Sequence, residues 1–522
     1  MTKNVKSFFD ENSKIVFIAT VIMMIVSHGF GFVNLMYSHD SLSFCDTQGL
    51  VKICLGRWMY SVLASKRLIA TPWLMGVLSI IFLSFATVLV TKTFEFNKYQ
   101  GICVAIVFSA NITLTDLFAI FIFDADADCL AALFACLAVY LFYKLPRYLN
   151  ILVPMLCLVM SLSLYQAYLC LALGLFLLLI IFDVKDAKCW KDVQETFILA
   201  IREAIVVILA MAIYLPLIYI VSSITGIPIS TGVTGPGSLG NNGIGTLIKQ
   251  IPGAYSYFIH KMFDVNEYNT VGMVRMNLVI VVLTIVLMGF YAYKRRKFGG
   301  ALLLIVPIVL IMPLALNAIY VVALGGVHQL MIFAFNLFYL LPLVLLKCIS
   351  YDNDKECIEE DKNTIYKYVV RIVSVTSIVA AIFIGGCNVI YSNGAYVYEK
   401  LIYDNTSWHA QKIWADVNNL EGFDSSQNDV YFMGDIRNSK IAYHGAADRR
   451  YKDYLTGANP TSITYEGTAY MFYYSILGSP MNIYYNDSTI LQSQDFVGMP
   501  VYPQEGYCKL IDGKAIVKLS DL

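Results

Sequence analysis

The chain has 522 residues, of which 58% are hydrophobic and 14% are charged. Soluble domains carry about a quarter charged residues, so this composition excludes an ordinary soluble protein. Lysine plus arginine and aspartate plus glutamate balance at 37 each. This balance argues against a nucleic-acid partner, which would favour a basic excess.

About eleven apolar segments predict an all-α polytopic membrane protein. They cover residues 15–37, 72–91, 100–122, 129–143, 149–164, 165–183, 196–222, 274–293, 299–322, 330–348 and 368–390. The fifth and sixth form one continuous apolar stretch that is too long for a single crossing. Because Tyr165-Gln166 interrupts this stretch, we expect a turn there between two short helices.

Basic residues predict the orientation of the chain. Lysines and arginines precede the first segment and follow the second, fourth, sixth, eighth and tenth, so they gather on one side if the segments alternate. Cytoplasmic loops carry such an excess. We therefore expect a multi-pass protein of the cytoplasmic membrane, with its N-terminus inside and residues 391–522 outside.

Two parts differ in composition. Residues 1–390 hold all the apolar segments and are predicted to form a membrane domain, whereas residues 391–522 are rich in Tyr, Asn, Asp and Gly. Short alternating runs around Asp512-Gly513 predict a β-hairpin. We expect the second part to be a small extracytoplasmic α+β domain.

Three outward loops are expected between the apolar segments. They cover about residues 38–71, 123–128 and 223–273. The third is long, which is usual for functional or mobile loops, and it contains an aromatic, amphipathic piece from Tyr255 to Phe263.

The cysteines do not predict a disulfide framework. Most lie inside apolar segments, as Cys103, Cys136, Cys157 and Cys170 do, where they act as small apolar residues. Cys508 is the one cysteine of residues 391–522, so this part has no partner for an internal disulfide.

Carboxylates gather at the outward ends of the segments. Asp40 follows the first segment, Asp116 lies in the outer half of the third, and Asp124, Asp126 and Asp128 precede the fourth. Ionisable groups at these depths are costly and are therefore candidates for function. The alternative is that the last three cap the fourth helix, where its dipole favours carboxylates, although one cap does not need three of them.

Cations lie in the first outward loop. Arg57 stands within the triplet Gly56-Arg57-Trp58, and its planar guanidinium suits bidentate contact with a phosphate. The alternative is an arginine that reaches lipid headgroups beside an interfacial tryptophan. Lys66 and Arg67 allow the same two interpretations.

Two polar turns complete the set of candidates. Tyr165-Gln166 either hydrogen-bonds a sugar or anchors the interface, and His328 lies in a short outward turn where a structural role is the alternative. No His/Cys/Asp cluster has zinc spacing, and no glycine-rich loop beside a Lys-Ser/Thr pair indicates nucleotide binding. An enzyme on the outer face would therefore draw its sugar from a lipid carrier.

Several sequence pieces, taken in order, resemble a known family. They are YSHDSL, LGRW, FDADADCLAALFACLAVYL, SLSLYQAYL and the terminal MPVYPQEGYCKLIDGKAIVKLS. Together they resemble the bacterial Gtr-type glucosyltransferases, which modify O-antigen in serotype conversion. The resemblance runs from about Tyr37 to the end of the chain. It implies the GT-C class and transfer of a sugar, glucose by analogy, from a polyprenyl phosphate sugar to an acceptor glycan outside the membrane.

The resemblance also implies roles for residues. A carboxylate of the first outward loop is the family's usual catalytic group and matches Asp40, the expected general base, while the acidic turn matches Asp124 and Asp126 as further catalytic candidates. Arg57 is expected on the donor phosphate. The other phosphate candidates are Lys66, Arg67 and Arg275, and the substrate-binding candidates are His39, Trp58, Tyr165, Gln166 and His328.

No cofactor is indicated with certainty, and a divalent metal stays open although the sequence does not indicate one. The first loop has His39-Asp40 where the wider class has paired acidic residues, which argues against a divalent metal there. The expected partners are a polyprenyl phosphate sugar, a glycan acceptor such as O-antigen, teichoic acid or another surface polysaccharide, and the lipid bilayer.

Two other function classes stay open from the sequence alone. A flippase or transporter for a lipid-linked sugar would need polar groups near mid-membrane and often has internal repeats, and little of either is present. A polysaccharide polymerase would depend more on outward arginines. The long outward C-terminal part favours the transferase.

The orientation can be tested with single cysteines at Thr2 and Ser425 in a variant without native cysteines. A membrane-impermeant thiol reagent should label position 425 in intact cells and position 2 only after permeabilisation. Labelling of position 425 only after permeabilisation would contradict the predicted orientation.

Overall fold

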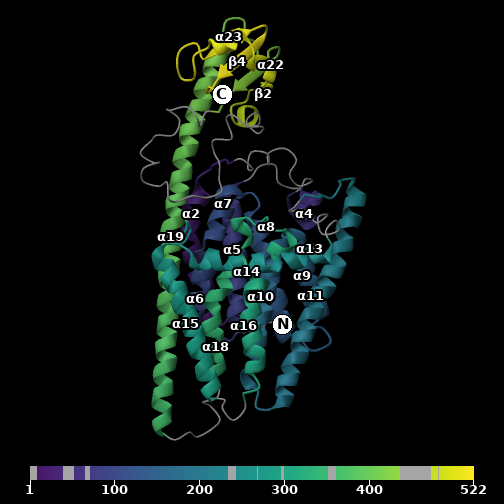
Figure 1. The fold of residues 1–522 in the computed structure, drawn as a ribbon, viewed down its shortest axis with the longest axis vertical. Coiled ribbons are helices and arrows are strands. Elements are labelled where there is room, and N and C mark those ends of the chain that lie inside the picture. The colour runs from purple at the N-terminus through teal and green to yellow at the C-terminus, as the bar shows by residue number, and fades with distance from the viewer. Residues whose placement is uncertain are drawn as a thin grey trace.

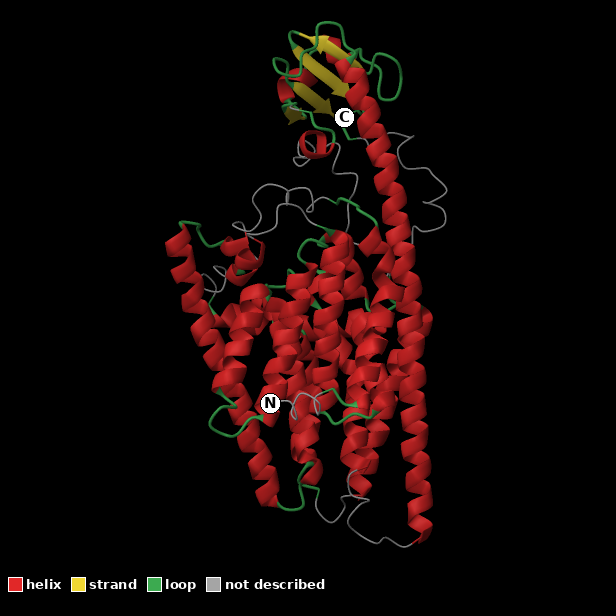
Figure 2. Cartoon of the chain, turned by 180° about the vertical axis from the view of Figure 1, so that it is seen from behind, coloured by secondary structure: helices red, strands yellow, loops and turns green. Residues whose placement is uncertain are grey.

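The computed structural model describes residues 9–38, 52–64, 71–232, 243–266, 268–294, 299–350, 360–435, 472–479 and 481–521. Helices make up most of this part of the chain, and a small sheet stands apart from them at the end of one long helix (Figures 1 and 2). His39, Asp40, Lys66 and Arg67 lie outside the described residues.

Seven helices of the described residues are long and apolar enough to cross a membrane. They are α2 (Glu11–Val33), α5 (Pro72–Thr93), α8 (Ala125–Lys144), α10 (Leu169–Asp183) with its leading turn η2 (Gln166–Tyr168), α11 (Trp190–Thr225), α15 (Val271–Lys294) and α19 (Glu360–Asn418). The bent pair α6 (Lys98–Ser109) and α7 (Ile112–Ile120) makes an eighth candidate if it is counted as one span. These helices therefore support the prediction that the chain is a membrane protein.

Shorter apolar helices occupy the remaining predicted segments. They are α9 (Leu152–Leu164), α16 (Leu302–Leu316), and η5 (Phe333–Leu340) continuing into α18 (Leu341–Ser350). Each of the predicted segments thus contains a helix. Length and composition do not show that the short helices cross a bilayer, so the number of eleven spans stays a prediction.

The turn expected at Tyr165-Gln166 is present. Helix α9 ends at Leu164, Tyr165 is extended, and η2 begins at Gln166. The start of α9 lies beside the end of α8, where Asn150 donates to the Phe142 carbonyl (3.3 Å). The apolar stretch 149–183 therefore forms two helices, as predicted.

Helices α6 and α7 meet at a break of about 40°. Asn111 shapes this break, because its side chain donates to the Phe108 carbonyl (2.8 Å) and accepts from the backbone N–H of Leu114 (3.0 Å). The amide thus caps α7 and satisfies backbone groups that the break exposes.

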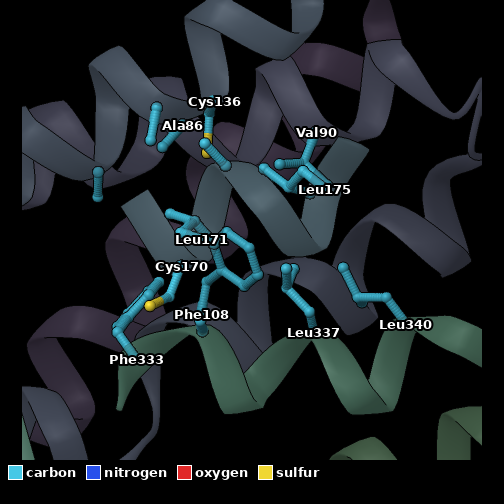
Figure 3. Packing of buried hydrophobic residues seen from close by; sticks show 14 of the residues in the cluster. Ala86, Val90, Phe108, Cys136, Cys170, Leu171, Leu175, Phe333, Leu337 and Leu340 are labelled. Atoms are coloured by element: carbon cyan, nitrogen blue, oxygen red, sulfur yellow. The ribbon is translucent and has the colours of Figure 1, made fainter. Parts of the chain in front are cut away.

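The centre of the helical bundle is apolar and closely packed (Figure 3). Phe108 of α6 meets Phe333 of η5 edge to face, with ring centroids 5.4 Å apart. Cys136 and Cys170 are free and buried in the same cluster. This confirms the interpretation of the membrane cysteines as small apolar residues.

Shorter elements complete the described helices. They are α4 (Trp58–Ala64), α13 (Ile244–Lys249), α14 (Ile251–Phe263), α17 (Ala318–Val322), η4 (Gln329–Met331) and η3 (Val184–Asp186), which follows α10 directly. Helix α14 buries Ala254, Phe258 and Met262, which are spaced by four residues, and this confirms the predicted amphipathic piece.

Helix α19 is far longer than a membrane crossing requires. Its 59 residues span about 88 Å at the rise of an α-helix, and it extends from the bundle to the small sheet (Figures 1 and 2). The predicted division between residues 390 and 391 falls inside this helix, where the chain continues without interruption.

The small sheet has the strand order β2-β1-β4-β3. Its strands are β1 (Val430–Met433), β2 (Ile483–Tyr485), β3 (Cys508–Ile511) and β4 (Lys514–Lys518), with short helices α22 (Ser488–Leu491) and α23 (Gln494–Val497) and a π-helical turn (Phe472–Ile476) beside them. Strand β1 is parallel to β2 and β4, and β3 is antiparallel to β4. Asp512 (φ 48°) and Gly513 (φ 75°) join β3 to β4, which confirms the predicted hairpin.

The sheet and the last turns of α19 share a hydrophobic core. Ala410, Ile413 and Val417 of the helix belong to one buried cluster with Phe432 of β1. Tyr37, just after α2, joins this cluster, and its ring centroid lies 6.2 Å from that of Tyr403. The start of the predicted first outward loop is therefore held against the extended part of α19.

Candidate functional site

The candidate site is built on a tight turn at residues 52–57, at the end of the bundle that faces the C-terminal sheet (Figure 1). The backbone N–H of Arg57 donates to the Lys52 carbonyl (3.0 Å), which closes the turn. Gly56 has a φ of 78°, and a Cβ atom there would lie 2.8 Å from the Tyr214 hydroxyl. Both the backbone conformation and the close approach require glycine at this position.

Two side chains from distant helices hold this turn. The Gln166 side-chain amide donates to the Leu55 carbonyl (2.6 Å) and to the Tyr214 hydroxyl (2.7 Å). The Tyr214 hydroxyl in turn donates to the Gly56 carbonyl (3.3 Å). Because Gln166 begins η2 and Tyr214 lies in α11, the turn is fixed to two helices of the bundle.

The chain that follows α11 also binds the turn. The backbone N–H of Ser230 donates to the Cys54 carbonyl (2.8 Å). Two of the predicted outward loops, 38–71 and 223–273, therefore meet at this place.

A buried ion pair connects the turn to the acidic residues before α8. The Lys52 ammonium pairs with a carboxylate oxygen of Asp124, and these residues are 6% and 3% exposed. The Lys52 nitrogen also lies 5.4 Å from the centroid of the Tyr60 ring and 5.5 Å from that of Phe123. The other Asp124 oxygen has no hydrogen-bond partner within the part of the chain that the structure describes.

The three carboxylates Asp124, Asp126 and Asp128 are all buried. Asp124 stands at the N-cap position of α8 but makes no side-chain capping hydrogen bond, and the other two lie inside the first turn. The capping alternative therefore does not account for Asp124. Asp128 interacts electrostatically with Lys52 and Arg57, so the acids and cations form one cluster.

Arg57 is half-buried and lies over the ring of Tyr165. Its guanidinium carbon is 4.2 Å from the Tyr165 ring centroid, and its Nε donates a long hydrogen bond to the Gln166 side-chain oxygen (3.4 Å). Among the described residues, no carboxylate forms an ion pair with Arg57. The stacked guanidinium therefore has donors available for an anion.

The ring of Tyr165 supports Arg57 by a cation–π contact. The structure thus brings together three residues predicted separately, Arg57, Tyr165 and Gln166.

The remaining predicted residues take no part in the contacts among Arg57, Tyr165 and Gln166. Trp58 begins α4, and its buried indole N–H has no hydrogen-bond partner among the described residues. Arg275 is exposed near the start of α15, which packs against α14, α18 and α19. His328 is exposed in the turn before η4.

Sequence analysis missed Lys52 and Tyr214. Lys52 carried a signal, since it is a lone lysine five residues before Arg57 in a half-polar segment. Tyr214 carried none, because it stands in an apolar helix among residues that face lipid. The described residues contain no group of three or more His, Cys, Asp or Glu side chains arranged to hold a metal ion.

A family model described as Glucosyl transferase GtrII matches residues 29–347, which is more than half of the chain. The chain belongs to the GtrII glucosyl transferase family. The match includes the turn at residues 52–57, the acidic residues before α8, and Tyr165-Gln166. Neither a curated protein nor a solved structure gives a significant match.

GtrII membership supports a role in glucosyl transfer and implies a sugar donor and a glycan acceptor. The matched residues end within α18, so α19 and the C-terminal sheet lie beyond them. The cluster of Lys52, Arg57 and the three aspartates thus belongs to the part of the chain that defines the family.

The Lys52–Asp124 pair can be tested by stability. Lys52→Met should lower the midpoint of thermal unfolding in detergent by several degrees, because it leaves a buried carboxylate unpaired, a loss of about 3–5 kcal/mol. Adding Asp124→Asn should recover most of this loss. Lys92→Met is the matched control, since Lys92 pairs with the exposed Asp10 (3.1 Å) and such pairs contribute about 0–1 kcal/mol. A Lys52→Met protein as stable as the wild type would show that the pair does not hold the turn.

Proposed function

We propose that this protein transfers glucose from a polyprenyl phosphate sugar to a glycan on the outer face of the cytoplasmic membrane. The observation that carries the proposal is the position of Arg57 in a member of a glucosyl transferase family. Its guanidinium is fixed by Tyr165 and Gln166, lacks a carboxylate partner among the described residues, and stands beside a cluster of acids.

The polyprenyl phosphate donor is proposed because it suits a site built among apolar helices. The donor carries one phosphate, a charged group that a planar arginine fork recognises, and an apolar tail that needs only apolar helix surfaces. The family match supports glucose as the sugar. The orientation, with the site outside, rests on the one-sided distribution of lysine and arginine.

The proposed reaction is a displacement at the anomeric carbon. An acceptor hydroxyl attacks this carbon and loses its proton to a carboxylate, and the bond from the anomeric carbon to the phosphate oxygen breaks with its electron pair going to the phosphate. Charge grows on the leaving phosphate in the transition state, and a fixed cation there lowers the barrier. Arg57 is the proposed cation.

Asp40 remains the proposed general base, on the evidence of the sequence. Asp124 is less suited to this role, because Lys52 already engages one of its carboxylate oxygens. Asp126 is buried in the first turn of α8 and is the second candidate.

Replacing Asp40 tests the proposed base. Asp40→Asn should leave the amount of folded protein in the membrane unchanged and lower turnover of a polyprenyl phosphate glucose donor by roughly two or more orders of magnitude, the scale of a lost general base. Transfer at the wild-type rate would remove Asp40 from the mechanism and assign the role to Asp126.

A conservative change at Arg57 tests the phosphate contact. Arg57→Lys should raise the KM for the donor and lower kcat, because lysine cannot present a planar fork or stack on Tyr165 in the same way. Arg275→Lys is the matched control and should retain activity, since an exposed lysine also reaches headgroups. Normal donor kinetics in Arg57→Lys would show that another group holds the phosphate, with Arg275, Lys66 and Arg67 as the remaining candidates.

A further inference from the structure

A second polar site lies away from Arg57, between α14 and α17. It is an open groove of about 530 Å³, within the range of roughly 300–1,000 Å³ typical of small-molecule sites. Its lining includes Ser256, Tyr257, His260, Asp264, Asn266 and Tyr320. No role has been given to these residues so far.

Two tyrosines form the aromatic wall of the groove. The ring centroids of Tyr257 and Tyr320 are 5.5 Å apart and the rings are tilted by 47°. Tyr320 approaches the backbone of α14 closely, because a Cβ atom at Gly253 would lie 2.8 Å from its ring. The side chain of Asn317 donates to the Ala254 carbonyl (2.9 Å) and fixes the start of α17 to α14.

The charges around the groove balance. His260 contacts Asp264, the residue that follows α14, and Lys261 also lines the groove. The Lys261 nitrogen lies 4.6 Å from the centroid of the Tyr268 ring and 5.8 Å from that of Tyr257. The lining holds one lysine and one aspartate, so it does not present the excess of positive charge that selects phosphate.

A small amide-lined chamber adjoins the groove, and Lys261 lines both. The chamber has a volume of about 60 Å³, room for about two water-sized groups. Its polar lining includes Asn111, Asn269, Gln329, Asn336 and Asn388.

Two side-chain oxygens of residues that line this chamber have no hydrogen-bond partner among the described residues. They are the side-chain carbonyl oxygens of Asn388 and Gln329, and both atoms are buried. Asn388 is only 5% exposed, and its amide nitrogen is already bound to the Ala110 carbonyl (2.9 Å). Leaving a buried acceptor without a partner is unfavourable, and a hydroxyl donor would remove this penalty.

We infer that the groove between α14 and α17 binds a neutral sugar residue of the glycan acceptor, with one of its hydroxyl-bearing arms entering the amide-lined chamber. Aromatic faces suit the C–H face of a sugar ring, and the amide and carboxylate oxygens can accept hydrogen bonds from its hydroxyl groups. The inference rests on the proposed function, since it names where the acceptor of that reaction binds.

The groove and the acids beside Arg57 are linked by α7 and the turn that follows it. Lys261 interacts electrostatically with Asp116 of α7, and α7 ends at Ile120, four residues before Asp124.

The test uses the full-length protein, radiolabelled polyprenyl phosphate glucose, and surface glycan extracted from a host strain that lacks this protein. Two products are measured: label in the glycan, and free glucose formed by transfer to water. Tyr257→Ala and Asn388→Leu should each raise the KM for glycan at least tenfold and leave free glucose formation unchanged. Tyr255→Ala, on the same helix but outside the groove lining, should behave as the wild type.

The outcomes separate the two proposals. Loss of free glucose and of labelled glycan together in Tyr257→Ala, or no change in either, would overturn the groove as an acceptor site. If the wild type transfers label from the donor neither to glycan nor to water, the proposed function fails. The groove is then judged by thiol labelling of Ser256→Cys in a variant without native cysteines.

In that labelling experiment, the extracted glycan should slow modification of position 256 several-fold, and Tyr257→Ala should abolish this protection. Absence of protection would overturn the inference. Protection by inorganic phosphate or by anionic lipid vesicles, in place of the glycan, would also overturn it and would identify an anion site.

Discussion

The buried ion pair between Lys52 and Asp124 is the interaction on which the candidate site depends. Removing two charges from water is costly, and the cost is recovered only while both partners stay in contact. The pair therefore fixes the turn at residues 52–57 to the acidic turn before α8. Gly56 and Arg57, which follow within the same tight turn, are positioned by this constraint together with the hydrogen bonds from Gln166.

Arg57 differs from Lys52 because its guanidinium still has charge and hydrogen-bond donors available for a ligand. Lys52 is satisfied by Asp124, so it acts as a structural cation, whereas Arg57 is held through an aromatic ring and one long hydrogen bond. A cation that is fixed in place but not neutralised suits a charge that develops during reaction. Helix α7 connects this cation site to the amide-lined chamber, so donor and acceptor sites are proposed at the two ends of one short helix.

The sequence predicted the features that depend on local pattern. Apolar runs located the helices, the polar pair Tyr165-Gln166 located the turn between α9 and α10, and Asp512-Gly513 located the hairpin. Helix α19 is longer than its apolar run because it continues along the C-terminal sheet. There only one face of the helix is buried, so the helix is amphipathic and not uniformly apolar.

Long-range contacts could not be predicted in the same way. Nothing local shows that Lys52 meets Asp124, which is 72 positions away, or that Gln166 meets Tyr214, 48 positions away.

The most direct test of the account is a cryo-EM structure of the protein in a lipid nanodisc with a non-hydrolysable polyprenyl phosphate glucose analogue. The account predicts the donor phosphate within hydrogen-bonding distance of the Arg57 guanidinium, with the Lys52–Asp124 pair intact beside it. A phosphate bound at the exposed Arg275, with Arg57 turned toward lipid headgroups, would contradict it.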